Sequence, residues 1–174
     1  MVEPVERDSR GILHPRAALE RFTLERFGPS AAVARFVDRY WVVSWHLPDG
    51  QRHEQQVLVH PVVNIVFEGD TATVTGVQVK RFTKVLTGRG RALGVMFRPA
   101  GFRPLLGRSV STITGAALPL AEVLPALQDL QLGPALADTP GDELSASVDK
   151  ALAGIPHRSC AARGCCSHGI SPPS

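Results

Sequence analysis

Cysteine is absent from the first 159 residues of this 174-residue chain. Cys160, Cys165 and Cys166 all lie in the final segment, so no disulfide framework of the kind found in small secreted domains supports the fold. Long apolar runs are also missing, because no stretch approaches the roughly 18 apolar residues of a transmembrane helix. The N-terminus, MVEPVERDSRG, is charged and has no apolar signal-peptide core. We therefore expect a cytoplasmic protein without a membrane partner.

Neither sign of charge is in large excess. The 19 Lys and Arg residues and the 16 Asp and Glu residues give a formal net charge of +3, which is a weak indication of a nucleic-acid partner. Basic residues gather on one predicted hairpin, where they could contact DNA or an acidic partner, although charge also protects an exposed sheet edge. These residues are Lys80, Arg81, Lys84, Arg89 and Arg91.

The motifs of common enzymes are missing as well. There is no Gly-x-Ser-x-Gly elbow, no His-Glu-x-x-His helix and no phosphate-binding loop, so we expect no catalytic residues, no enzymatic activity and no cofactor. Three histidines recur at seven-residue spacing, which has no special metal geometry across separate strands, and the C-terminal His and Cys residues are irregularly spaced. We therefore expect no metal site at either group: His46, His53 and His60, or His157, Cys160, Cys165, Cys166 and His168.

The middle of the chain is rich in β-branched and aromatic residues. Between about residues 40 and 98, short apolar segments alternate with turn residues at intervals of about 8 to 12 residues. This spacing predicts a small antiparallel β-barrel or sandwich. In the segment YWVVSW, Trp41, Val43 and Trp45 point one way and Val42 the other, so both faces of that strand should be covered.

Helical patterns flank the predicted strands. Residues about 15–39 and about 101–155 carry apolar residues at helical spacing, which predicts an α+β domain over residues 15–156 with N-terminal and C-terminal helices. Residues 1–14 have the composition of a flexible lead-in. The periodicity stops after residue 156, so residues 157–174 are predicted to be a disordered tail.

One segment predicts a sharp corner between the strands and the C-terminal helices. In GVMFRPAGFRPLLG, residues 94–107, Pro99 ends a strand because proline cannot donate to a β-ladder. Gly101 permits the reversal, and Phe102 lies at helical spacing from two leucines that follow. With Pro104 as a second rigid residue, we predict a structural role for this corner.

A pocket at the mouth of the predicted barrel is the default ligand site, because ligand pockets combine apolar walls with a few polar groups. Asn64 is informative since it interrupts an apolar strand, and a buried amide needs partners that are either ligand or backbone. Arg98 could instead pair with Glu68 or cap carbonyl groups at the corner. The candidate residues are Trp41, Trp45, His60, Asn64 and Arg98.

Several of these segments together resemble the N-terminal regulatory domain of AraC-type transcriptional regulators. They are RFVDRYWVVSWHL, HPVVNIVFEG, GVMFRPAGFRPLLG and ALPLAEVL, which occur in the family's order over about residues 14–125. The resemblance implies a domain of mixed β-barrel and helical build that senses a small-molecule effector or forms a homodimer. Ligand binding in such a regulator shifts the population of an attached DNA-binding domain.

The chain departs from that family pattern in its last part. Intact members continue with a helical domain that reads DNA through two helix-turn-helix units. Residues 157–174 have no such pattern and look like the product of a frameshifted or truncated reading frame. If so, DNA binding requires a domain that this chain does not contain.

Two other interpretations remain open at this point. The first is a stand-alone barrel of the cupin type that binds a metal or a small molecule, with or without enzymatic activity. The second is a fragment without function, whose predicted helix at 118–131 exposes an apolar face that once met another domain.

Overall fold

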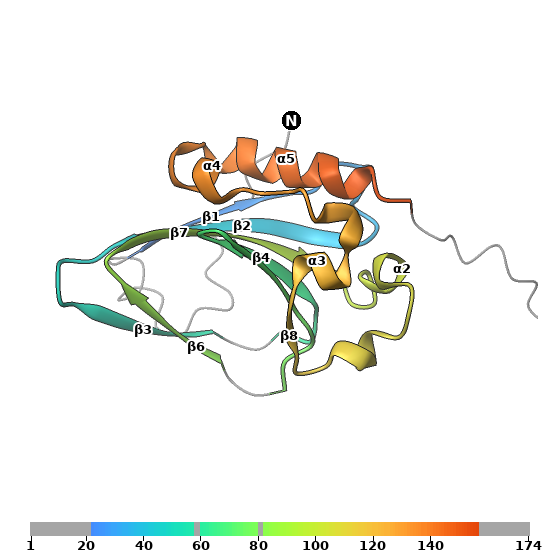
Figure 1. Ribbon diagram of the computed structural model, residues 1–174, viewed down its shortest axis with the longest axis horizontal. Coiled ribbons are helices and arrows are strands. Elements are labelled where there is room, and N and C mark those ends of the chain that lie inside the picture. Colours follow the sequence, from blue (N-terminus) through green and yellow to red (C-terminus); the bar gives the residue numbers. More distant parts are fainter. Residues whose placement is uncertain (1–21, 58–59, 80–81, 157–174) are drawn as a thin grey trace, which may run out of the picture.

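The computed structural model describes residues 22–57, 60–79 and 82–156 (Figure 1). These residues form a six-stranded antiparallel sheet in the order β1-β2-β7-β4-β5-β8 and a two-stranded sheet of β3 and β6. The strands are β1 (Phe22–Phe27), β2 (Val37–His46), β3 (Arg52–Val57), β4 (Asn64–Glu68), β5 (Thr71–Thr75), β6 (Phe82–Thr87), β7 (Arg89–Phe97) and β8 (Ala117–Pro119).

Helices follow the strands and cover one face of the large sheet, while β3 and β6 lie across the other face (Figure 1). The helices are α2 (Arg103–Leu106), α3 (Leu120–Val123), α4 (Gly133–Asp138) and α5 (Gly141–Ala153), with short 3-10 turns at η1 (Val110–Ile113) and η2 (Pro125–Leu127). No helix among the described residues is long and apolar enough to cross a membrane.

The main core lies between the large sheet and the helices. Alternate residues of β2, β4 and β7 point to this side, and α5 adds an apolar stripe that meets them. Many of the side chains here are at most 2% exposed, so the layer is close-packed. They include Tyr40, Val42, Ile65, Phe67, Leu93, Val95, Phe97, Leu144, Val148 and Leu152.

A buried carboxylate ties α5 to β2. Asp149 of α5 accepts hydrogen bonds from the Tyr40 hydroxyl (2.9 Å), the Ser30 backbone N–H (3.0 Å) and the Ser30 hydroxyl (2.5 Å). Burial, and then the neighbouring charge of Asp149, raise the pKa of Tyr40 well above its ordinary value. This phenol therefore remains a hydrogen-bond donor, and the bond fixes α5 on the sheet.

The α+β class and the C-terminal helices are confirmed, but the predicted N-terminal helices are wrong in the described part. Residues 22–27 form β1, which pairs with β2 from Phe22 opposite Trp45 to Phe27 opposite Tyr40. Residues 31–36 form turns rather than a helix. Pairing with a long central strand outweighs the weak local helix propensity of this segment.

Two further expectations need correction. The predicted helix at 118–131 is broken, because α3 ends at Val123 and only a 3-10 turn follows at Pro125. The strands of the described residues form two separate sheets and no closed barrel. The lead-in at 1–14 and the tail at 157–174 lie outside the described residues.

The corner after β7 has a tight backbone. Ala100 adopts a positive φ of 61°, and the Gly101 N–H donates to the Arg98 carbonyl at 2.8 Å. A Cβ added at Gly101 would collide with the backbone of Phe36, which explains the glycine. Phe102 is buried in a T-shaped contact with Phe97, with 4.8 Å between ring centroids. Pro104 lies in the first turn of α2, where no amide donor is required.

Candidate ligand cavity

A cavity of about 500 Å³ separates the large sheet from β3 and β6. Its volume lies in the usual range for small-molecule sites. The large sheet supplies the floor, because the alternate residues of β1, β2, β4, β5 and β7 that do not face the helices face this space. β3, β6 and the segment before β4 complete the lining with Gln55, Lys84, Leu86, His60 and Val62.

The floor is hollow because β7 presents small residues to it. Gly90 lies opposite Trp45 in the ladder, and Gly94 lies opposite Trp41. A Cβ added at either glycine would collide with the indole ring of its partner. Each tryptophan ring therefore lies directly over the backbone of β7, because the glycine opposite it has no side chain that would hold the ring away from the strand.

The two tryptophans have different surroundings. Trp45 is only 9% exposed, packs with Phe22 and Leu86, and donates from Nε1 to the Thr87 carbonyl at 3.1 Å. Trp41 is partly exposed in the cavity, and its Nε1–H makes no hydrogen bond within the described residues. Trp45 is thus part of the protein's own packing, whereas one face of Trp41 is available to a ligand.

Polar groups gather at the β4–β5 side of the floor. Asn64 lies opposite Thr75, and Thr73 lies opposite Val66. All four residues line the cavity. The Asn64 amide makes no side-chain hydrogen bond within the described residues and is partly exposed. The cavity therefore has an aromatic side at β2 and a hydrogen-bonding side at β4 and β5.

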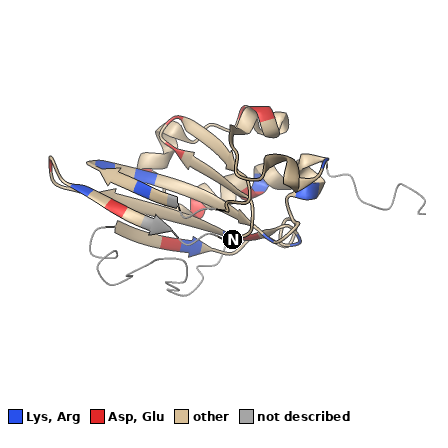
Figure 2. Ribbon diagram, turned by 90° about the horizontal axis from the view of Figure 1, so that it is seen from below, with Lys and Arg blue, Asp and Glu red and all other residues tan. Residues whose placement is uncertain are grey.

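Charged residues at the cavity are paired. Lys84 of β6 donates to Glu68 of β4 at 2.6 Å, which connects the two sheets. Arg39 binds its neighbour Asp38 at 2.7 Å. Arg26 also lines the cavity and has an interaction partner of its own. On the face shown in Figure 2, basic and acidic residues are interspersed and do not form one charged patch.

Of the five ligand-binding candidates predicted from the sequence, four line the cavity and one does not. Trp41, Trp45, His60 and Asn64 line the cavity, with His60 at its exposed rim. Arg98 is not among the lining residues, so its placement in the pocket is corrected. Its Nε instead donates to the carbonyls of Ala34 (2.8 Å) and Val37 (3.3 Å), which is the capping role considered above.

The predicted basic hairpin does not form a single surface. Lys84 faces the cavity, and Arg91 points to the opposite side of the sheet. There Arg91 donates to the carbonyls of Leu136 (3.2 Å) and Thr139 (2.5 Å). Arg89 is exposed, while Lys80 and Arg81 lie outside the described residues.

Sequence reasoning missed several lining groups. The run Gly88-Arg89-Gly90 is typical of a turn, but Gly90 belongs to β7 and supports Trp45. The threonines of TATVT alternate with Ala72 and Val74, and this period of two was a usable signal that they share one face. The Lys84–Glu68 pair had no local signal, because 16 residues separate its members.

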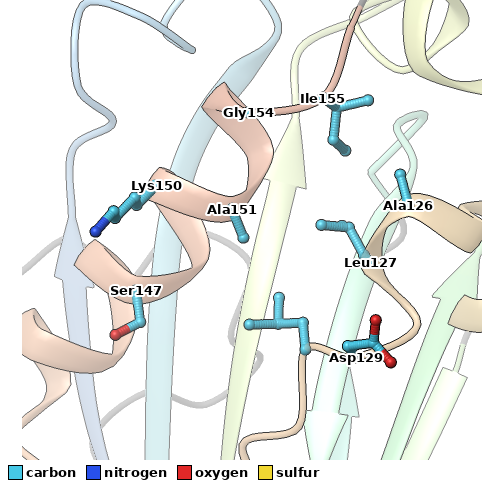
Figure 3. A pocket seen from close by; sticks show the side chains of 9 residues that line it. Ala126, Leu127, Asp129, Ser147, Lys150, Ala151, Gly154 and Ile155 are labelled. Atoms are coloured by element: carbon cyan, nitrogen blue, oxygen red, sulfur yellow. The ribbon is translucent and has the colours of Figure 1, made fainter.

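A second hollow of about 460 Å³ lies between η2 and α5 (Figure 3). Leu127, Leu130 and Ile155 supply apolar surface, while Lys150 extends away from Asp129. The polar groups do not converge, so this groove is a weaker candidate for small-molecule binding.

Within residues 22–57, 60–79 and 82–156, no group of three or more His, Cys, Asp or Glu residues is arranged to hold a metal ion. The second His and Cys group considered above, at residues 157–168, lies outside the described part.

Comparison with known protein families identifies one match, which spans most of the strands that form the cavity. No curated protein and no solved structure matches the chain. One family model, described as a domain of unknown function (DUF6597), matches residues 25–119. The match extends from β1 to β8 and covers more than half of the chain. The chain therefore belongs to the DUF6597 family.

Proposed function

We propose that this chain is the effector-sensing part of an AraC-type transcriptional regulator, acting in the cytoplasm, and that the cavity is its effector site. The observation that carries the proposal is the cavity itself, which offers an open indole face at Trp41 and an unpaired amide at Asn64. In this proposal the two sheets are halves of an open, barrel-like sandwich around the ligand.

The resemblance supports the same assignment. The HPVVNIVFEG segment includes β4, which supplies Asn64, and GVMF is the end of β7, which supplies Gly94. Some of the segments that carry the family likeness thus also supply the cavity floor. DNA would be read by helix-turn-helix units of the kind found in intact regulators, and homodimer formation belongs to the same proposal.

A physical route from the cavity to the helices runs through β2. Trp41 faces the cavity, and the preceding residue, Tyr40, faces the helices and binds Asp149 of α5. A ligand that shifts β2 also shifts the hydrogen bond that fixes α5. Ligand binding then changes the population of α5 positions, which is how a sensor domain acts on whatever follows it.

A screen of small molecules by thermal shift, followed by calorimetry, tests the effector site. We expect hits to bind the wild-type chain with one-to-one stoichiometry. Val66 lines the cavity in the same row of the floor as Trp41, so Val66→Phe should abolish binding by placing a phenyl ring where the ligand would lie. Val79 is 74% exposed and is not a lining residue, so Val79→Phe is the matched control and should bind normally.

Hydrogen exchange tests the sensing role. A bound hit should alter amide exchange across Gly141–Ala153 in the wild-type chain. A ligand that fills the cavity without changing exchange in α5 would contradict a sensing function. Hits that bind Val66→Phe as well as they bind the wild type would contradict the cavity as the site.

A further inference from the structure

We infer that the cavity selects an uncharged, planar aromatic molecule that carries a hydroxyl or carbonyl group at one edge. This inference rests on the proposed function, since it names the ligand class of the same site. It follows from three features of the floor: a flat aromatic platform, a hydrogen-bonding edge and the pairing of nearby charges.

The platform is the indole of Trp41. One face of the ring rests on Gly94, where a side chain would collide with it, so the opposite face is the one that lines the cavity. Val66 continues the same row across the sheet, because both Trp41 and Val66 pair with Gly94. A planar ring can stack here with offset geometry, whereas a bulky saturated ring makes poorer contact.

The hydrogen-bonding edge lies in the next row of the floor. Asn64 and Thr75 are two residues further along their strands, which corresponds to about 7 Å from the Trp41 row. A ring stacked on Trp41 can therefore direct a polar substituent to the Asn64 amide. That amide donates and accepts, so both hydroxyl and carbonyl groups satisfy it.

Charge pairing disfavours an ionic ligand. Lys84 is paired with Glu68 at 2.6 Å, and Arg39 is paired with Asp38 at 2.7 Å. Arg26, the remaining Lys or Arg of the lining, also has an interaction partner. An ionised group would have to break one of these pairs or lose its hydration without compensation. An uncharged ligand incurs neither cost.

Three probes of similar size test this class by calorimetry on the intact chain: 2-naphthol, its saturated analogue decahydro-2-naphthol, and 2-naphthoate. We expect 2-naphthol to bind about tenfold tighter than decahydro-2-naphthol because only it stacks. We expect 2-naphthoate to bind at least about tenfold more weakly than 2-naphthol because of its charge.

Variants assign the two contacts. Trp41→Leu should weaken 2-naphthol about tenfold and leave decahydro-2-naphthol within about twofold, whereas Trp41→Phe should retain most of the preference. Asn64→Leu should weaken both alcohols about fivefold. A purely structural loss at Trp41 would lower both affinities equally, and circular dichroism checks that each variant folds.

The outcomes separate the ligand class from the site. Equal binding of the two alcohols, tighter binding of 2-naphthoate, or no binding of 2-naphthol overturns the ligand class. In each case, the proposed effector site would still be supported if other molecules from the screen bind the wild-type chain and fail to bind Val66→Phe. If all binding persists in Val66→Phe, both proposals fail.

Discussion

The two faces of the large sheet are built from alternate residues of the same strands, yet they differ in almost every physical respect. Towards the helices, Tyr40, Val42 and Leu93 are at most 1% exposed and close-packed. Towards β3 and β6, Trp41 and Gly94 border an open space. The period of two in a strand thus allows one face to supply stability and the other to retain a cavity.

The largest expected difference in stability between the two faces is found at two neighbouring residues of β7. Phe97 is fully buried against the helices, and Met96 lines the cavity. We expect Phe97→Ala to lower the free energy of unfolding by about 4 kcal/mol and Met96→Ala by about 1 kcal/mol, because only the first leaves a void in a packed core. Urea denaturation measures both. Equal losses would contradict the division of the sheet into a packed and an open face.

The next largest loss of stability is expected at the hydrogen bonds of Asp149, which connect α5 to β2. Asp149→Ala should cost about 3 kcal/mol, since it leaves the buried Tyr40 hydroxyl and the Ser30 groups without their acceptor. Tyr40→Phe should cost about 1 kcal/mol because Ser30 still satisfies Asp149. Urea denaturation would show the order, and a larger loss for Tyr40→Phe would contradict the central role of the carboxylate.

The raised pKa of Tyr40 adds a pH dependence. In the unfolded chain the phenol ionises near pH 10, whereas in the folded chain it holds its proton to higher pH. Stability from this group is therefore complete below about pH 10 and declines above it, by up to about 1.4 kcal/mol per pH unit. Urea denaturation at increasing alkaline pH should show a steeper loss for the wild type than for Tyr40→Phe. Tyr40 is the only tyrosine of the chain, so tyrosinate absorbance reports its ionisation directly.

A smaller effect is expected on the cavity side. Gly94→Ala places a methyl group against the Trp41 ring, so the ring must move at a cost of about 2 kcal/mol, and the stacking platform is lost. Gly154 has an ordinary φ and only contacts of 3.5 Å or more around an added Cβ, so Gly154→Ala is the matched control and should be nearly neutral. Thermal denaturation distinguishes the two, and similar melting temperatures would contradict the close Trp41–Gly94 contact.

The smallest effect distinguishes the two tryptophans. Trp45→Phe should destabilise by about 1 kcal/mol through its lost hydrogen bond to Thr87 and its reduced packing, while Trp41→Phe should change stability less. Acrylamide should quench Trp41 fluorescence, measured in Trp45→Phe, more strongly than Trp45 fluorescence, measured in Trp41→Phe. Equal quenching would show that Trp45 is as open to the cavity as Trp41.

Much of the strand content could be predicted from the sequence, because β-branched and aromatic segments separated by turn residues have few alternatives. The end of the strand at Pro99 was also predictable, since proline restricts the backbone locally and removes a ladder donor. The reason for glycine at 101 was not, because it lies in the close approach of Phe36, 65 residues earlier in the chain. Phe22–Phe27 was not, because its strand conformation depends on a partner in β2 about 20 residues away.

The same distinction holds for the cavity. Trp41, Trp45 and Asn64 could be identified because their residue types stand out in apolar strands. Arg98 could not be assigned, since a guanidinium at a corner reaches either a ligand or nearby carbonyls. The hollow itself depends on Gly90 and Gly94 lying opposite the two indoles, which is a property of strand register.

The sequence by itself determined the alternation of residues along each strand, the end of β7 before Pro99 and the amphipathic stripe of α5, because each depends on neighbours within a few residues. Only the tertiary structure decided which face of the sheet meets the helices, which tryptophan is open to the cavity, and that Asp149 binds Tyr40. Those outcomes depend on contacts between distant residues, and Tyr40 and Asp149 are 109 positions apart. Local propensity contains no information about such pairings, because they form only when the sheets and helices pack together.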